Sequence, residues 1–253
     1  MLYRGKEEIM NKKSYSKINL FIRSFIFSIY SVTSICIYSV LVSCALVLPL
    51  RYRLAMISGF LRAYVYVLKV VCHIDYKVEG LEHIPSDRNG IIMSKHQSTW
   101  ETFYLPVLFH VPAAIAKREL LWVPFFGWGF AASEPITINR SNKASAMQQI
   151  IKEGKKRLEQ GRWIMFFPEG TRIAPGHVGH YKLGGARLAA ATGYPVIPVA
   201  HNAGLYWPRR KFIKRPGTIR MVIGPLIESH NRTPEEIMEL AKGWIETTMK
   251  QIG

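Results

Sequence analysis

The sequence is poor in cysteine. Among its 253 residues there are three cysteines, and all of them lie in the N-terminal third, at Cys36, Cys44 and Cys72. No C-x-x-C spacing occurs, which argues against a structural zinc site, a disulfide framework and cysteine-based catalysis. A reducing compartment is therefore the simplest setting for the chain. Internal repeats and low-complexity linkers are also missing, and the length suits one good-sized domain with an appendage.

Acidic residues are scarce as well. The chain carries 17 Asp and Glu residues against 34 Lys and Arg residues, which gives a formal net charge of +17. An excess of positive charge indicates anionic partners, because it raises their concentration near the protein surface. Nucleic acid, anionic lipid and phosphate-bearing substrates all fit, and composition alone does not choose among them.

Formal charge is absent from residues 24–50, which are rich in aliphatic and aromatic side chains. As a helix this stretch would be about 40 Å long, enough to cross a hydrocarbon core of about 30 Å with some tilt. In a second apolar stretch, 54–74, Arg62 and Lys69 are spaced to share a helical face. That spacing suits an interfacial helix or a helix that returns to the same side. We therefore expect residues 1–74 to form a membrane-anchoring helical pair.

Two other interpretations of the N-terminal segment carry less support. One is a secretory signal peptide, but the basic leader is too long for one and no A-x-A cleavage site follows it. Residues 41–44 (LVSC) do resemble a lipoprotein cleavage box, and cleavage there would export the rest of the chain.

Ser24, Ser28 and Ser31 share one helical face that could pack on a neighbouring helix. Basic residues flank the apolar stretch on both sides, so they predict no orientation in the membrane.

From residue 75 onward, short apolar runs typical of strands alternate with helical patterns, which predicts an α/β domain over 75–253. The last helix has the clearest start, because Thr233, Pro234 and Glu236 form a capping-box pattern with proline in the first turn. We expect that helix to run to about residue 251. The other expected helices are 142–158 and 183–192, and the expected strands are 76–80, 90–94, 112–116, 134–139, 163–167, 194–200 and 218–223.

The first polar segment with catalytic potential, 95–101, directly follows an expected strand and contains His96 and Glu101. A histidine can take up a proton near neutral pH, and a carboxylate on its other nitrogen fixes the tautomer and stabilises the imidazolium. The spacing alone is weak evidence, because His230 and Glu235 show it too. Those two residues lie in a polar turn and at a helix start, where Glu235 compensates the helix dipole.

Other roles for this segment remain open at this point. Ser98 and Thr99 are possible nucleophiles, although their short spacing from His96 does not ensure the required geometry. Alternatively, His96 is a hydrogen-bonded histidine at a strand end with no catalytic role.

The second polar segment, 168–172, follows the expected strand 163–167. Its glycine permits a tight turn and Arg172 can grip a phosphate with two parallel hydrogen bonds. The alternative is a turn with a solvated arginine. A third segment, 205–215, interleaves aromatic and basic residues. Beside a membrane anchor we interpret it as a surface for anionic lipid, with a nucleic-acid surface or a solvated loop as the alternatives.

Together these segments resemble the lysophosphatidic acid acyltransferase family, the 1-acyl-glycerol-3-phosphate acyltransferases. Four blocks occur in the family's order: 96–101 looks like the H-x4-D block, 136–140 ends in arginine like the second block, 167–172 matches F-P-E-G-T-R, and 196–199 resembles the fourth. The resemblance covers about residues 75–225. The chain departs from the pattern at Glu101, where the family has aspartate.

The resemblance implies the glycerolipid acyltransferase fold, a mixed central sheet with flanking helices. It also implies acyl transfer from acyl-carrier protein or coenzyme A to the sn-2 hydroxyl of 1-acyl-glycerol-3-phosphate (lysophosphatidic acid), forming phosphatidate. By this resemblance His96 deprotonates the hydroxyl, Glu101 orients His96, and Arg172 holds the phosphate. Lys117 and Arg140 assist Arg172, while the pocket is shaped by Glu169, Gly170 and Thr171. No metal ion, cofactor or acyl-enzyme is implied.

The expected partners are lysophosphatidic acid, an acyl-carrier protein or coenzyme A thioester and an anionic membrane, with no nucleic acid. The expected location is the cell (inner) membrane, with the catalytic domain facing the cytoplasm. An acyltransferase acting on another lysolipid, an ornithine-lipid precursor or glycerol-3-phosphate is the alternative. A non-enzymatic basic protein that binds membranes or nucleic acid is a distant one.

Overall fold

A seven-stranded sheet forms the centre of the computed structural model, which describes residues 15–138 and 143–253. The strand order is β1-β7-β6-β2-β5-β3-β4. Neighbouring strands run parallel except for β6 and β7, which pair antiparallel. The sheet is therefore mixed, as expected. Its strands are β1 (Ile74–Glu79), β2 (Ile91–Ser94), β3 (Ala113–Lys117), β4 (Ile136–Ile138), β5 (Ile164–Phe166), β6 (Val196–His201) and β7 (Gly217–Ile223).

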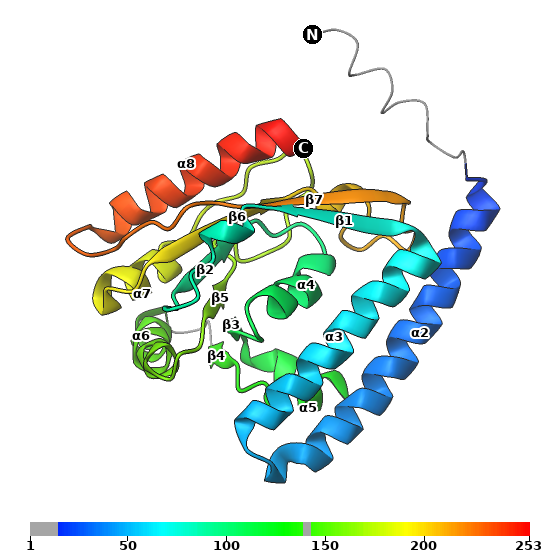
Figure 1. Cartoon of the computed structure of the whole chain (residues 1–253), viewed down its shortest axis with the longest axis horizontal. Coiled ribbons are helices and arrows are strands. Elements are labelled where there is room, and N and C mark those ends of the chain that lie inside the picture. Colours follow the sequence, from blue (N-terminus) through cyan, green and yellow to red (C-terminus); the bar gives the residue numbers. More distant parts are fainter. Residues whose placement is uncertain (1–14, 139–142) are drawn as a thin grey trace, which may run out of the picture.

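The helices surround this sheet (Figure 1). Every strand and helix expected from the sequence is present within a few residues of its expected place. The expected strand end at 139 and helix start at 142 lie outside the described residues. Two short helices, α4 and α5, were not predicted, because α4 contains Pro106 and α5 is six residues long with two glycines. The helices are α2 (Lys17–Cys44), α3 (Leu50–Cys72), α4 (Trp100–Leu108), α5 (Phe126–Ala131), α6 (Lys143–Glu159), α7 (Gly184–Thr192) and α8 (Pro234–Ile252), with 3-10 turns η1 (Ala45–Val47), η2 (Leu81–His83), η3 (Arg118–Trp122) and η4 (Ala203–Leu205).

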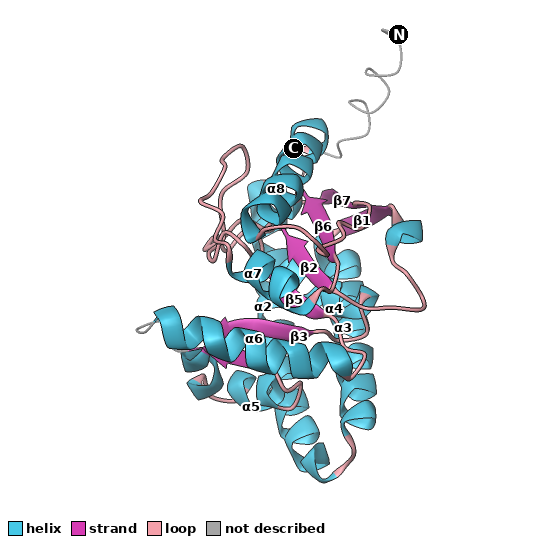
Figure 2. Cartoon of the chain, turned by 90° about the vertical axis from the view of Figure 1, so that its left-hand side faces the viewer, coloured by secondary structure: helices cyan, strands magenta, loops and turns pink. Residues whose placement is uncertain are grey.

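The two faces of the sheet pack against different helices. Figure 2 shows α7 and α8 on one side of the strands and α3 and α4 on the other. Side chains of β2 alternate between the two cores, since Ile91 and Met93 join the core under α6, α7 and α8, while Ile92 joins the core with α3 and α4. This period of two is the signature of a strand buried on both faces. The carboxyl end of β2 is therefore held rigidly in the middle of the molecule.

The N-terminal helices α2 and α3 lie side by side, antiparallel, along one flank of the domain (Figure 1). By length and composition both segments, Lys17–Val47 and Leu50–Cys72, could cross a membrane. One side of the pair packs on the domain, where Tyr64 stacks on Phe103 with ring centroids 4.2 Å apart. The other side leaves large apolar residues of α2 exposed, among them Phe21, Phe25 and Ile29. Together these features indicate association with a membrane.

The serine face of α2 contacts the neighbouring helix α3, as expected, and it also contacts the α/β domain. The Ser31 hydroxyl lies 2.8 Å from the Tyr64 hydroxyl of α3. The Ser24 hydroxyl accepts a hydrogen bond of 2.9 Å from the backbone N–H of Lys214, in the segment 205–215. The helical pair is therefore joined to the domain at several points. The division into 1–74 and 75–253 stays a prediction.

The last helix begins with the capping box that the sequence indicates. The Thr233 hydroxyl accepts from the Glu236 N–H at 3.2 Å, and the Glu236 carboxylate accepts from the Thr233 N–H at 2.7 Å. Buried side chains of α8, including Ile237, Ala241 and Ile245, then enter the core over β6. The cap thus fixes where the buried face of α8 starts.

We expect Thr233→Ala to lower the free energy of unfolding by about 1 kcal/mol, because it removes the acceptor for one of the free N–H groups of α8. Thr247→Ala is the matched control, since Thr247 is exposed within the same helix and alanine favours helix at such positions. Unfolding in one detergent, followed by circular dichroism, would compare the two variants. Equal stability of both would contradict a role for the cap.

Candidate active site

The first polar segment joins β2 to α4, and the second follows β5. Because β2 and β5 are parallel neighbours in register, their carboxyl ends meet at one edge of the sheet, where functional side chains gather in α/β proteins. The two segments are bonded to each other directly. The backbone N–H of His96 donates to the Glu169 carboxylate at 3.0 Å, and the Ile173 N–H donates to the His96 carbonyl at 2.8 Å.

His96 and Glu101 form a hydrogen-bonded pair. The distance from His96 Nδ1 to Glu101 Oε1 is 2.8 Å, because Glu101 stands in the first turn of α4 and folds back toward the histidine. The ring of His96 also stacks on Phe167 with centroids 4.1 Å apart. A carboxylate on Nδ1 favours the tautomer that carries its proton there. Nε2 is then the basic nitrogen.

The Glu101 side chain is fully buried, and hydrogen bonds from its neighbours stabilise the ionised carboxylate. Its carboxylate also accepts from the backbone N–H groups of Gln97 and Ser98 at 2.9 and 2.8 Å. Burial by itself raises the pKa of Glu101, but neighbouring His201, the bond from His96 and the Ser98 amide more than reverse this. The pKa of Glu101 therefore lies below its ordinary value, and the group stays ionised at neutral pH.

His201, at the end of β6, is a fully buried histidine behind the pair, and the sequence analysis did not identify it. Its Nε2 lies 2.8 Å from the Lys95 carbonyl and 3.9 Å from Glu101 Oε2. Burial lowers the pKa of His201, although the Glu101 carboxylate and the Lys95 carbonyl oppose that shift. Because a carbonyl oxygen can only accept, Nε2 of His201 donates the hydrogen bond to Lys95. His201 thus lies against Glu101, while His96 keeps the direct hydrogen bond to that carboxylate.

A buried network of charges lies beneath the two segments. Lys95 Nζ donates to Glu169 Oε1 at 2.7 Å and to Glu246 Oε1, on α8, at 2.9 Å. The hydroxyl of Tyr181 donates to the same Glu246 oxygen at 2.6 Å. The Lys95 side chain is 1% exposed and that of Glu169 is fully buried. Buried carboxylates are costly unless they are paired and hydrogen-bonded, and Lys95 provides the charge that pairs both.

The Glu169 carboxylate therefore acts through the backbone of its neighbours. Its side chain accepts from Lys95, from the His96 N–H and from the Gly179 N–H at 3.2 Å, and it does not line the cavity. Gly170, next in the chain, has a φ of +65°, and a Cβ there would stand 2.9 Å from Lys182 Nζ. The left-handed backbone of this turn favours glycine, while the Lys182 side chain could shift to make room for a Cβ.

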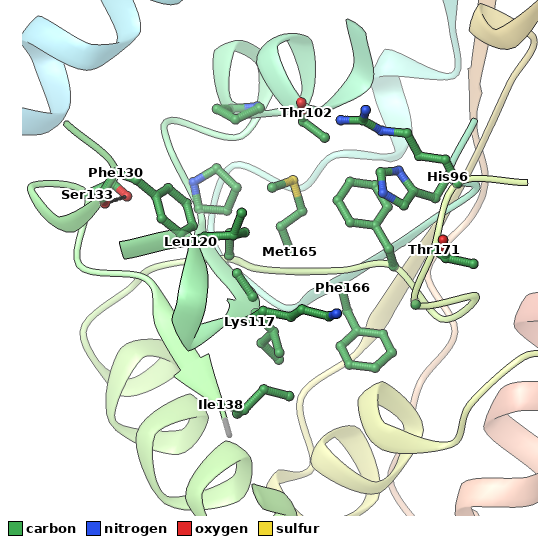
Figure 3. A pocket seen from close by; sticks show the side chains of 18 of the residues that line it. His96, Thr102, Lys117, Leu120, Phe130, Ser133, Ile138, Met165, Phe166 and Thr171 are labelled. Atoms are coloured by element: carbon green, nitrogen blue, oxygen red, sulfur yellow. Dashed lines mark hydrogen bonds between the residues drawn. The ribbon is translucent and has the colours of Figure 1, made fainter. Parts of the chain in front are cut away.

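A cavity of about 1340 Å³ opens in front of His96. Figure 3 shows His96 and Thr171 on one side of it and Phe130 and Leu120 on the other, with Lys117 reaching in toward Phe166. Its basic lining comprises His96, Lys117, Arg172, His180, Lys182, Arg187 and Arg209. Its apolar lining includes Ile35 of α2, Phe60 of α3 and Phe126 of α5. One space therefore connects a base, a cluster of cations and the N-terminal helices.

A family model described as Acyltransferase matches residues 75–202, which include both polar segments and most of the sheet. The chain belongs to the acyltransferase family.

Individual relatives agree with this assignment. The chain is 45% identical over 210 residues to the 1-acyl-sn-glycerol-3-phosphate acyltransferase of Pseudomonas aeruginosa, covering 81% of both proteins. It is 30% identical over 202 residues to the protein of the same name from Saccharomyces cerevisiae, covering 76% of this chain and 65% of that one. Its fold matches the crystal structure of PlsC, the 1-acyl-sn-glycerophosphate (LPA) acyltransferase of Thermotoga maritima, with a TM-score of 0.79. The two sequences are 25% identical, and the match covers 93% of this chain and 96% of that one.

This acyltransferase brings most of the residues expected at its site together. His96, Lys117, Gly170, Thr171 and Arg172 line the cavity, while Glu101 and Glu169 support it from behind. Arg140 lies outside the described residues. Neither Ser98 nor Thr99 lines the cavity, and the Ser98 hydroxyl donates instead to the Trp207 carbonyl at 2.7 Å. Within 15–138 and 143–253, no three His, Cys, Asp or Glu side chains converge to hold a metal ion.

Several cavity and network residues of the acyltransferase were missed by sequence analysis, namely Lys95, Lys182, His201, Arg209 and Glu246. For Lys95 a signal existed, because a lysine directly between a buried strand and a candidate base is in a position to be buried. Glu246 gave none, since it lies 151 residues from Lys95 on a helix with an otherwise ordinary amphipathic pattern.

We expect Lys95→Met to lower the free energy of unfolding by about 3–5 kcal/mol, because it leaves the Glu169 and Glu246 carboxylates facing each other without a cation. Lys152→Met, at an exposed position of α6, should change it by less than about 0.5 kcal/mol. Chemical unfolding of both variants in the same detergent measures the difference. A Lys95→Met protein as stable as the Lys152→Met control would contradict this account of the network.

Proposed function

We propose that the protein transfers an acyl chain from a thioester donor to the sn-2 hydroxyl of 1-acyl-glycerol-3-phosphate and so forms phosphatidate. The observation that carries this proposal is a single cavity that joins the His96–Glu101 pair, the Arg172 guanidinium and an apolar lining. A lysophosphatidate has the three matching parts: a hydroxyl to deprotonate, a phosphate and an acyl chain. The names of the relatives from Pseudomonas aeruginosa and Thermotoga maritima support the same reaction.

The chemistry follows from the geometry of the pair. Nε2 of His96 takes the proton of the sn-2 hydroxyl while the hydroxyl oxygen attacks the thioester carbonyl. The tetrahedral intermediate then expels the donor's thiolate, which receives the proton from the His96 imidazolium. Glu101 holds the ring by Nδ1 and stabilises the imidazolium while it carries the extra charge. The acyl group passes directly from donor to acceptor, and no acyl-enzyme forms.

Arg172 is proposed to hold the acceptor's phosphate. Burial lowers the pKa of its guanidinium, although nearby Glu101 opposes this shift, so the group is partly dehydrated and ready to bind an anion. Arginine suits the task because its planar donors match two phosphate oxygens. Lys117 lines the same cavity and adds a second cation, and Arg140 is proposed as a further one. Gly170 and Thr171 shape the turn that presents Arg172.

The apolar part of the cavity is proposed to receive acyl chains from the bilayer. It ends against α2, α3 and α5, and α2 and α3 are the helices that could enter a membrane. We propose the cell (inner) membrane, with the catalytic domain facing the cytoplasm, where coenzyme A and acyl-carrier protein thioesters are made. The net charge of +17 favours contact with an anionic membrane and with either phosphate-bearing donor.

Purified protein in detergent or lipid should convert lysophosphatidate and an acyl thioester to phosphatidate, and His96→Ala should lower kcat by about 10²–10⁴ because the general base is lost. Release of the donor's free thiol measures the rate, and an acceptor panel with glycerol-3-phosphate and lysolipids without a phosphomonoester establishes the preference. His230→Ala is the matched control and should keep full activity. Full activity in a folded His96→Ala protein would refute the assignment of the base.

The side chain at position 101 gives a finer test. Glu101→Gln keeps the size but removes the charge, so we expect kcat to fall by about tenfold or more. Glu101→Asp keeps the charge and introduces aspartate, the residue that the family pattern has at this position. It should retain more activity than Glu101→Gln. Steady-state rates at saturating substrate give both values. If Glu101→Gln were as active as the unchanged protein, the carboxylate would have no role in stabilising the imidazolium.

A further inference from the structure

Two arginines from distant parts of the chain meet at the cavity beside His96. Arg172 ends the second polar segment, and Arg209 belongs to the segment 205–215. The Nη1 group of Arg209 donates to the backbone carbonyl of Arg172 at 2.9 Å. Both residues line the same cavity. The contact therefore holds the Arg209 guanidinium against the backbone of Arg172, near enough for its charge to act on the Arg172 guanidinium.

The segment 205–215 differs from the uniform lipid-facing surface that its sequence indicates. Arg210 and Lys211 are exposed to solvent and do not line the cavity. Lys214 is buried, with its ammonium over the rings of Phe27 and Trp207 at 5.5 and 5.3 Å. Arg209 instead turns into the cavity. Adjacent basic residues thus have three different environments.

The chain holds Arg209 in place from both sides. The Trp207 carbonyl accepts from the Ser98 hydroxyl at 2.7 Å, which ties the segment to the loop that carries His96. Further along, the Lys214 N–H donates to the Ser24 hydroxyl of α2. These contacts anchor the backbone on both sides of Arg209, and its side chain is itself bonded to the Arg172 carbonyl. This preorganisation lowers the entropy lost when a ligand binds.

The two guanidinium groups lack an acidic partner. Among the described residues, no carboxylate lies within salt-bridge distance of Arg172 or Arg209. Burial lowers the pKa of Arg172, Glu101 opposes that shift, and the charge of Arg209 lowers the pKa further. Two like charges held together in a partly buried site destabilise each other until an anion neutralises them.

We propose that Arg209 is a second ligand of the acceptor's phosphate and selects acceptors that carry a phosphomonoester. This inference rests on the proposed function and extends it to a residue outside the matched span 75–202. A phosphomonoester carries about −1.5 to −2 charges at neutral pH, which suits two guanidinium groups better than one. A phosphodiester or a neutral glycerol head group lacks the second charge.

The test compares Arg209→Gln with Arg210→Gln, its exposed neighbour, and with Arg209→Lys, which keeps the charge. We expect Arg209→Gln to raise the KM for lysophosphatidate by about tenfold or more, since a charge-assisted hydrogen bond contributes about 1.5–3 kcal/mol. Its KM for the acyl donor should stay within about twofold of the starting value. Arg209→Lys should recover part of the loss, and Arg210→Gln should leave both values unchanged.

A KM for lysophosphatidate within about twofold of the unchanged protein in Arg209→Gln would overturn the proposal. So would a rise confined to the KM for the donor, which would place Arg209 on the other substrate. Equal losses in Arg209→Gln and Arg209→Lys, with equal drops in melting temperature, would show that the residue serves the fold only, and would overturn it as well.

A second measurement separates this proposal from the proposed function. Inorganic phosphate should raise the melting temperature of the unchanged protein and of Arg210→Gln, and should raise that of Arg209→Gln much less, because ligand binding stabilises the folded state. If the protein acylates a different acceptor, the proposed function fails while this difference still supports the anion site. Equal stabilisation of Arg209→Gln and Arg210→Gln by phosphate would overturn the role of Arg209 whatever the acceptor is.

Discussion

The site depends on the buried contact between Lys95 and Glu169. One oxygen of Glu169 accepts from the Lys95 ammonium and the other from the His96 N–H, so a single carboxylate joins the two polar segments. The pair is stable in the interior because its neighbours complete its hydrogen bonds. Lys95 also donates to Glu246 of α8, and Glu246 accepts a further hydrogen bond from the Tyr181 hydroxyl. The position of His96 relative to the turn before Arg172 is therefore set by charged groups that do not line the cavity.

The rest of the function follows from that arrangement. The parallel neighbours β2 and β5 bring His96, the proposed base, and Arg172, the proposed phosphate ligand, to the same edge of the sheet. Negative charge is kept behind the cavity, on Glu101 and Glu169, while positive charge faces it on Arg172 and Arg209. This distribution of charge supports the proposal that a phosphate binds in the space in front of His96. The helices α2 and α3 close the apolar end of the same space, where a lipid chain would enter.

Local patterns predicted much of this from the sequence. The strands, the capping box at Thr233 and the pairing of His96 with Glu101 depend on residues close together in the chain, where spacing reports geometry. The extra methylene of Glu101 is accommodated because the carboxylate folds back onto the amides of Gln97 and Ser98. Its departure from the family pattern leaves the pair intact.

Contacts between distant residues could not be predicted in this way. Glu246 meets Lys95 only because α8 packs over β6, and no local pattern reports that approach. Arg209 and Arg210 are indistinguishable by composition, yet one lines the cavity and the other faces solvent. The helix α4, with Pro106 inside it, is stabilised by burial rather than by helix propensity, so its sequence gave little sign of it.

The central claim is that base and anion site act on one molecule, and a structure with lysophosphatidate bound tests it most directly. The account predicts the phosphate on the guanidinium of Arg172 and the sn-2 hydroxyl within hydrogen-bond reach of His96 Nε2 in the same acceptor. A lysophosphatidate whose phosphate lies away from Arg172, or whose hydroxyl lies away from His96, would contradict it.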